Sequence, residues 1–320
     1  NLEYFRGKTL GWSQFELVTP NLGGGTGSNT GLGVRALFAG GLTPSLSDVI
    51  DFLTISTLGD TQDFGDISAG KQAMSAVGSR TRALNIGGYT TGFENEIEFV
   101  TFASQGNITD FGNLTSNKNR TASCSDQVRG ITGGGNPNTN VIEHLTIAQT
   151  GNAVDFGDLT VARQSHVSFS SSTRGVFAGG YIEPGFTNVM DFVTISSTGN
   201  AIDFGDLLVA RMYGGGFSNS TRGIIGGGQS PSSNVNTIGF ITIATTGNEV
   251  DFGDMTDARR DVAGASSPTR GVFCGGWGSA PLTNIIDFVE ILTTGNAVDF
   301  GDQTTKRHRA SGCSNGHGGL

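Results

Sequence analysis

The chain has 320 residues, of which 52 are glycine and only 15% are charged, and its formal net charge is −9. This composition argues against a helical bundle and against charge-rich disorder, whereas 21 phenylalanines supply enough large apolar surface for a core. The acidic balance also argues against DNA or RNA as a partner, because binding to phosphates needs a basic face.

A tetrapeptide that recurs along the chain defines a repeat. Asp-Phe-Gly-Asp, in one copy Asp-Phe-Gly-Asn, occurs six times, at intervals of 47, 45, 48, 48 and 48 residues. Four short strands repeated at this period are typical of the blades of a β-propeller. The copies begin at Asp63, Asp110, Asp155, Asp203, Asp251 and Asp299.

Residues 1–20 start the chain in the middle of such a unit. Asn-Leu-Glu-Tyr-Phe, from Asn1, is in the frame of the third strand of a unit, and the stretch from Trp12 resembles the fourth. At the other end, residues 306–320 supply a first strand and a glycine pair. We therefore expect residues 1–20 and 306–320 to form one closing blade together, which gives seven blades and leaves no free sheet edge.

Each unit between these ends contains four expected strands, a to d. Strand a follows a basic residue and is rich in small residues, which suit a crowded central channel. Strand b ends in a glycine pair, strand c alternates polar and apolar residues, and strand d carries the tetrapeptide. A Gly-Asn or Gly-Asp pair, such as that at Gly199, supplies the positive φ of a tight turn between strands c and d. The prediction for residues 1–320 is one all-β domain, a seven-bladed β-propeller with four-stranded antiparallel blades.

The aspartates of the tetrapeptide recur together with arginines, so the same contact is expected in every blade. Calcium needs six to eight oxygens that converge from one short loop, whereas these two aspartates flank a phenylalanine on a strand. We predict instead that they pair with the recurring arginines of strands a and b, as a structural clamp and not as a metal site. The residues assigned to the clamp are Asp66, Asp158, Asp206, Asp254, Asp302, Arg163, Arg211, Arg259 and Arg307.

Three cysteines, Cys124, Cys274 and Cys313, have no metal-like spacing. Because Cys124 and Cys313 fall at equivalent places in distant repeats, we expect free, buried thiols and no disulfide. No run of about 18 apolar residues is present, so no insertion into a membrane is expected.

The glycine pair of strand b, the acidic and aromatic positions of strand c and the basic residue before strand a resemble the kelch repeat over nearly the whole chain. One departure is the phenylalanine of the tetrapeptide, such as Phe204, where kelch repeats usually have tryptophan. This pattern and the ending Ser-Asn-Gly-His-Gly-Gly-Leu are similar to the kelch-like, galactose-oxidase-like repeat proteins of marine phages, cyanophages especially. The resemblance implies a structural protein associated with the virion or its tail.

The same resemblance raises an oxidase as an alternative function. Galactose oxidases hold copper with tyrosines and histidines, but the four tyrosines and four histidines of this chain are scattered over different units. The nucleophile elbow of a serine hydrolase is not found in the sequence either. We therefore expect neither enzyme activity nor a cofactor.

The loops between strands b and c differ in length and content from unit to unit, whereas the c–d turns are short and uniform. The residue after the glycine pair is Tyr89, Tyr181, Gln229 or Trp277 in four of the units, and Phe186 lies in the same loop as Tyr181. Aromatic side chains on rigidly held loops suit contact with a saccharide or a protein. The alternative for each of them is packing against the adjacent loop.

These expectations lead to one functional hypothesis and two alternatives. The chain is predicted to be a non-enzymatic structural or adhesive component of a phage particle, virion-bound or extracellular and oligomeric in an assembly. Its expected partners are other virion proteins or copies of itself, with no nucleic acid and no membrane insertion. The alternatives are a lectin-like propeller that binds cell-surface glycans and a self-assembling extracellular fibre of stacked propellers.

Overall fold

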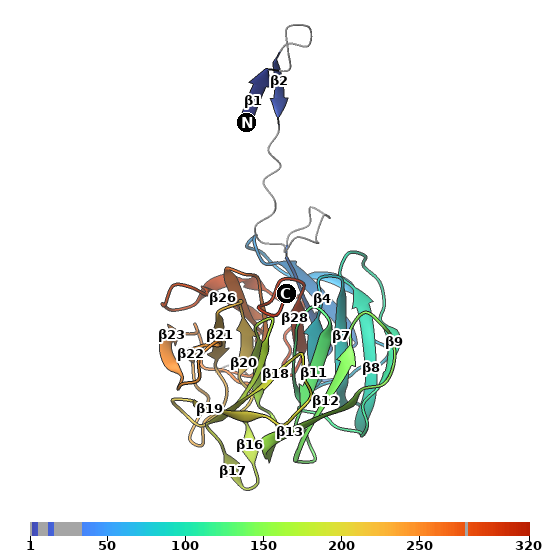
Figure 1. Ribbon diagram of the computed structural model, residues 1–320, viewed down its shortest axis with the longest axis vertical. Coiled ribbons are helices and arrows are strands. Elements are labelled where there is room, and N and C mark those ends of the chain that lie inside the picture. The colour runs from blue at the N-terminus through green and yellow to red at the C-terminus, as the bar shows by residue number, and fades with distance from the viewer. Residues whose placement is uncertain (1, 6–11, 16–33, 279–280) are drawn as a thin grey trace.

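A computed structural model of the protein describes residues 2–5, 12–15, 34–278 and 281–320 (Figure 1). All regular secondary structure in these residues is β-strand, so the expected all-β class is confirmed. Six sheets of four antiparallel strands are arranged as the blades of a propeller. In Figure 1, inner strands such as β20 and β28 lie toward the middle of the body, and outer strands such as β9 and β23 lie at its edges.

The first three blades follow one plan, with strands a, b, c and d in order from the axis outwards. Blade 1 contains β28 (Ser311–Ser314), β3 (Arg35–Ala39), β4 (Val49–Thr54) and β5 (Gln62–Asp66). Blade 2 contains β6 (Ser75–Gly78), β7 (Arg82–Tyr89), β8 (Phe93–Thr101) and β9 (Thr109–Asn113). Blade 3 contains β10 (Ala122–Ser125), β11 (Arg129–Gly133), β12 (Thr139–Thr146) and β13 (Val154–Arg163).

The other three blades repeat the plan, and blade 4 adds a small hairpin in its b–c loop. Blade 4 contains β14 (Val167–Ser170), β15 (Arg174–Ala178), β18 (Val189–Thr194) and β19 (Ile202–Asp206), with the hairpin β16 (Tyr181–Ile182) and β17 (Gly185–Phe186). Blade 5 contains β20 (Gly215–Ser218), β21 (Arg222–Gly226), β22 (Thr237–Thr242) and β23 (Val250–Asp254). Blade 6 contains β24 (Ala263–Ser266), β25 (Arg270–Cys274), β26 (Ile285–Glu290) and β27 (Val298–Asp302).

The prediction of seven blades is wrong, because the described residues form six. The C-terminal strand β28 pairs with β3, with Ser311 opposite Ala39, and so completes blade 1. Residues 306–320 therefore do contribute a strand a, but their partner is not residues 1–20: β1 (Leu2–Phe5) and β2 (Trp12–Phe15) form a two-stranded sheet of their own. Residues 1, 6–11 and 16–20 of the expected closing blade lie outside the described residues.

The glycine pair that ends strand b is required by close approach of two backbones. In blade 4, Gly179 and Gly180 have φ of +66° and +108°, conformations that residues with a side chain rarely adopt. A Cβ atom at Gly179 would lie 2.7 Å from the carbonyl oxygen of Arg211, and one at Gly180 would lie 2.6 Å from that of Gln164. Strand b can therefore meet the two segments that flank its blade only through glycine.

Apolar packing and a recurring arginine join each blade to the next. Phe204 of blade 4 is 2% exposed and packs with Ile241 and Ile243 of blade 5. Its ring meets that of Phe192 edge to face, with centroids 5.9 Å apart. The guanidinium of Arg174 covers Phe192 at 4.5 Å and donates a hydrogen bond of 3.1 Å to the carbonyl oxygen of Ile243. Arg174 thus fastens strand b of blade 4 to strand c of blade 5.

Candidate functional site

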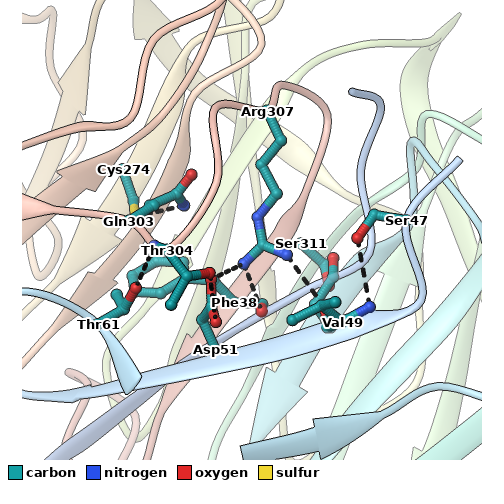
Figure 2. Close-up of polar contacts among 11 residues, drawn as sticks. Phe38, Ser47, Val49, Asp51, Thr61, Cys274, Gln303, Thr304, Arg307 and Ser311 are labelled. Atoms are coloured by element: carbon teal, nitrogen blue, oxygen red, sulfur yellow. Dashed lines mark hydrogen bonds and ion pairs between the residues drawn. The ribbon is translucent and has the colours of Figure 1, made fainter. Parts of the chain in front are cut away.

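Each blade holds a buried ion pair close to the linker that enters it, where a linker is the segment between strand d of one blade and strand a of the next. In blade 1, Arg307 donates from Nη2 to Asp51 Oδ2 at 2.8 Å and to the carbonyl oxygen of Phe38 at 3.1 Å (Figure 2). Its Nη1 donates to the carbonyl oxygen of Val49 at 3.0 Å. The hydroxyl of Thr304, from the same linker, donates to both oxygens of Asp51. One guanidinium therefore ties the linker to strands b and c of the blade that follows.

The arginines of the predicted clamp are placed as expected, but their carboxylate partner is different. Arg163 pairs with Asp191 at 2.8 Å, and Arg259 pairs with Asp287 at 3.0 Å. Asp191 and Asp287 lie on strand c and are fully buried. The partner is thus the acid of strand c and not the second aspartate of the tetrapeptide.

The assigned tetrapeptide aspartates Asp66, Asp158, Asp206, Asp254 and Asp302 have no ion pair among the described residues and are half-buried or exposed. Side chains alternate along a strand, so the buried Phe204 turns Asp203 outwards, away from the clamp. Asp206 follows Gly205, whose φ is +142°, and is exposed as well.

The clamp is kept in all six blades although its residues change. Blades 2 and 3 use a lysine with a glutamate: Lys71 with Glu98, 2.7 Å apart, and Lys118 with Glu143. In blade 5, Gly239 stands where strand c carries its acid in the other blades, and Arg211 pairs with Glu249 instead. A Cβ atom at Gly239 would lie 1.9 Å from Glu249 Oε1, so Glu249 occupies the space that the strand-c acid fills elsewhere.

Burial opposes the charged form of several clamp members, and the ion pairs offset that cost. It lowers the pKa of the guanidinium of Arg163 and raises the pKa of the carboxyl of Asp51, while in each case the partner charge acts in the opposite direction. Such pairs hold a fold in one arrangement more than they stabilise it, because desolvation consumes most of the Coulombic gain. The clamp is a framework feature.

The aromatic residues predicted for ligand contact are half-buried and pack within their own neighbourhood. The rings of Tyr89 and Phe93 meet edge to face with centroids 5.9 Å apart, and those of Tyr181 and Phe186 do so at 6.1 Å. Trp277 packs on His308 of the next linker at 5.2 Å. The position after the glycine pair also forms a backbone bridge with the preceding linker, as Gln229 does with Met212. These side chains therefore take part in the loop structure and still present their outer edges.

The inner strands line a narrow channel along the axis, with a cavity of about 60 Å³ bordered mainly by glycine, alanine and serine. The small residues expected there are confirmed. The last residue of a strand a donates its hydroxyl to the equivalent carbonyl of the preceding blade: Ser170 to Ser125 and Ser218 to Ser170, both at 2.7 Å. The six equivalent residues are Gly78, Ser125, Ser170, Ser218, Ser266 and Ser314.

Residues 315–320 lie across one end of this channel, which we call the tail mouth. His317 Nδ1 accepts a hydrogen bond from the backbone of Gly319, so Nε2 carries the proton and donates to the carbonyl oxygen of Gly78 at 2.8 Å. A Cβ atom at Gly319 would lie 1.8 Å from the carbonyl oxygen of Ser125. The tail mouth is therefore filled by backbone and by one imidazole.

The other end of the channel, the linker mouth, is formed by six residues that each follow the clamp base by two positions. All six have φ between +53° and +62° although none is glycine. The backbone N–H of each donates to the carbonyl oxygen of the equivalent residue in the preceding linker, and the first donates to the last, with lengths from 2.7 to 3.2 Å. The six residues are Ala73, Arg120, Ser165, Tyr213, Asp261 and Arg309.

The side chains of the linker mouth enclose a cavity of about 100 Å³. The guanidinium carbons of Arg120 and Arg309 lie 5.3 Å and 6.0 Å from the ring centroid of Tyr213. Asp261 accepts hydrogen bonds from Arg309 Nε at 3.3 Å and from His308 Nδ1 at 3.2 Å. Ser165, which is 6% exposed, has a buried hydroxyl oxygen that makes no hydrogen bond with the described residues.

His166 lines the same cavity with a buried imidazole, and both ring nitrogens are without a hydrogen-bond partner among the described residues. Burial and the nearby charge of Arg163 hold the pKa of His166 well below its usual value, so the ring is neutral. The linker mouth therefore combines two cations, one carboxylate and neutral hydrogen-bonding groups in one confined space.

Sequence reasoning missed the linker mouth, although a signal for it exists. Within a constant frame, the position two residues after the clamp base holds five residue types in six units. Positions that vary inside an otherwise uniform repeat are candidates for function, because the framework does not require any one side chain there.

The three cysteines are free and buried, as expected from the sequence. Burial raises the pKa of each thiol to about 12, so all three are protonated and unreactive at neutral pH. Among the described residues, no group of three or more histidine, cysteine or acidic side chains could hold a metal ion. The same residues contain no helix with the length and apolar character to cross a membrane.

Comparison with known proteins gives this chain no family. No family model matches the sequence, and no curated protein matches it. What is established is the β-propeller architecture of six four-stranded blades. The kelch-like pattern stays a resemblance between residue patterns.

Proposed function

We propose that the chain is a non-enzymatic binding scaffold, in which a closed ring of six blades holds one face rigid for contact with a partner. That face, the loop face, consists of the six b–c loops and the six linkers. The observation that carries the proposal is the cycle of six backbone hydrogen bonds at the linker mouth, because it joins every linker to the one before it. Arg307 and Asp51, 256 positions apart, add a buried contact between the two ends of the cycle.

The distribution of charge and of variation supports the same proposal. Twelve of the 19 lysines and arginines occupy two framework positions of the repeat, in the clamp and at the start of strand b. The framework residues repeat from blade to blade, whereas the residue type at equivalent positions of the loop face varies, as at Tyr181, Gln229 and Trp277. A rigid framework with a varied surface is the usual design of a binding protein.

The partner we propose is another protein of a virus particle or a second copy of this chain, in an assembly that is virion-bound or extracellular. Support for this choice is the resemblance in residue pattern to virion-associated repeat proteins. A kelch-like scaffold would then connect components of the particle and would catalyse no reaction.

Face-resolved photo-crosslinking in the native assembly tests this function. A photoreactive amino acid is placed at Gln229 on the loop face or, as the matched control, at Leu58, which is 61% exposed on a c–d turn of the opposite face. We expect cross-links to a partner from Gln229 and none from Leu58. Cross-links from Leu58 alone, or from neither position, would contradict contact through the loop face.

Glycan binding is the second candidate, and the aromatic pairs of blades 2 and 4 favour it. Tyr89 with Phe93 and Tyr181 with Phe186 form half-buried, edge-to-face pairs held by short hairpins, which suits stacking against a sugar ring. A glycan array with the wild-type protein and Tyr181→Ala separates the two functions. Binding that the substitution abolishes favours a lectin, and an array without signal removes this candidate.

A further inference from the structure

The guanidinium of Arg120 differs from the basic groups of the six clamps because no carboxylate among the described residues pairs with it. It lies over Tyr213, and its Nη1 is 3.4 Å from Gln164 Oε1, which is a weak contact. Its Nε is enclosed and has no hydrogen-bond partner within the described part of the chain. The clamp bases, such as Arg163, are buried more completely, and each has a buried carboxylate at its Nη2 or Nζ. Arg120 therefore brings to the linker mouth a positive charge that pairs with no carboxylate in the part of the chain that the structure describes.

The groups around Arg120 are arranged to accept one small anion. Arg309 also lies near the ring of Tyr213 and, like Arg120, borders the cavity of about 100 Å³, while its Nε and Nη1 donate to Asp261 and Gln72. Ser165, 6% exposed, brings to the cavity a hydroxyl that makes no hydrogen bond with residues 34–278 or 281–320. Two guanidiniums and a hydroxyl are the donors that bind carboxylates most strongly in proteins.

The charge of the linker mouth selects among anions. Of the charged side chains that border the cavity, Arg120 and Arg309 contribute two positive charges, and Asp261, which accepts from Arg309 and His308, contributes one negative charge. Arg260, whose Nε lies 3.7 Å from Asp261 Oδ2, does not border the cavity. The remaining charge of about +1 matches a monoanion, whereas a phosphate dianion would meet the repulsion of Asp261 at short range. The volume is that of a few heavy atoms, which admits a carboxyl group and excludes a whole sugar or side chain.

We propose that the linker mouth binds a single carboxylate group, held by Arg120, Arg309 and Ser165, from a small organic acid or from an acidic sugar such as a uronic acid. This inference rests on the proposed function only in requiring that the loop face is accessible. It assigns a ligand chemistry to the position whose residue type varies within the otherwise uniform repeat.

Ligand-observed NMR with the full chain tests the site, with acetate, glucuronate, glucose and inorganic phosphate as probes. We expect saturable binding of acetate and glucuronate, and neither glucose nor phosphate should bind as tightly. Arg120→Gln should weaken binding about tenfold or more, because it removes a charge-assisted hydrogen bond. Ser165→Ala should weaken it a few-fold and is a mild change that leaves the framework in place.

Lys306→Gln is the matched control, because it removes one positive charge from an exposed position that does not border the cavity. It should bind both acids like the wild type, and circular dichroism should show the same fold for all variants. Tighter binding of glucuronate than of acetate assigns the site to an acidic sugar, and equal binding assigns it to a free organic acid.

The proposal is overturned if neither acid binds, if glucose or phosphate binds as well as the acids, or if Arg120→Gln and Ser165→Ala leave the affinity unchanged. These results are independent of the cross-linking at Gln229 and Leu58. The linker mouth can therefore fail as a carboxylate site while the loop face stands as a docking surface, and the reverse also holds.

Discussion

The two ends of the axial channel are built from the same six inner strands, yet they differ in what they allow. At the tail mouth, carbonyl oxygens and hydroxyls meet in the channel, and five of the six equivalent residues are serine. At the linker mouth, the same backbone hydrogen bond joins every linker to the one before it, whereas the side-chain contacts, such as that of Arg309 with Asp261, differ from unit to unit. The clamp bases, two residues earlier in the chain, hold the linkers in position. The side chain at one position of a repeat can therefore differ from unit to unit when other residues hold the backbone at that position.

Breaking a clamp, which positions the linker mouth, should have the largest effect on the free energy of unfolding. Arg163→Met removes the base that anchors the linker at Ser165 and leaves Asp191 buried without its partner charge. We expect a loss of about 3–5 kcal/mol in the free energy of unfolding, measured by chemical denaturation. The double variant Arg163→Met with Asp191→Leu should recover most of that loss, and a double variant as unstable as the single one would argue against the uncompensated charge as its cause.

Displacing residues 315–320 from the tail mouth should have the next largest effect on the free energy of unfolding. Gly319→Ala places a methyl group 1.8 Å from the carbonyl oxygen of Ser125, so residues 315–320 must shift. We expect a loss of about 1–3 kcal/mol in the free energy of unfolding, as for overpacking in a well-filled interior. Gly92→Ala is the control, because nothing lies within 4 Å of its added Cβ. A tail displaced without any change in stability would show that it covers the channel without packing in it.

Acid should destabilise both mouths through their histidines. Burial lowers the pKa of His166 and of His317 below the usual value of 6.5, so the unfolded chain binds more protons than the folded protein below that pH. Stability should be fully present above pH 6.5 and should fall as the pH drops, by at most about 1.4 kcal/mol per pH unit for each histidine. Thermal unfolding between pH 7 and pH 5 measures this slope, which His166→Met should flatten. An unchanged slope in that variant would mean that His166 does not contribute.

The smallest effects compare two serines of one segment. Ser170→Ala removes a hydroxyl that donates to the carbonyl oxygen of Ser125, at an expected loss of about 1 kcal/mol. Ser165→Ala removes a buried hydroxyl for which the described residues offer no partner, so the free energy of unfolding should stay the same or rise slightly. If both variants lose the same stability, then the hydroxyl of Ser165 has a partner in solution.

Much of the architecture follows from residue types and their spacing. Some requirements are local: the positive φ of the glycine pair, the small residues of strand a and the turn glycines. Each copy of the repeat therefore contains residues that meet them. The number of blades does not follow so directly, because it depends on which segment supplies the missing strand of blade 1. Six tetrapeptides correspond to six blades, and the resemblance of the stretch from Asn1 to a strand c led to one blade too many.

The candidate site was harder to predict than the fold because it depends on contacts between units. Asp191 and Asp206 are both aspartates of one unit, and only the burial of strand c shows which of them meets Arg163. The alternation of side chains along strand d, with Phe204 buried, was a usable signal that the tetrapeptide aspartates do not form the clamp. The neighbourhood of Arg120 and Tyr213 was not predictable, because these residues are 93 positions apart and lie in linkers that meet only at the axis.

The exchange of Gly239 and Glu249 in blade 5 has a consequence for how such chains diverge. Here a negative charge has moved ten positions along the chain and onto a neighbouring segment, yet it reaches the same point in space beside Arg211. What is kept at that point is therefore the place of the negative charge beside Arg211, and not the residue type at one position of the sequence. Two related propellers could keep every clamp and still share few identical residues. Ancestry in this architecture is therefore better traced by comparing the positions of buried charges in superimposed structures than by sequence identity.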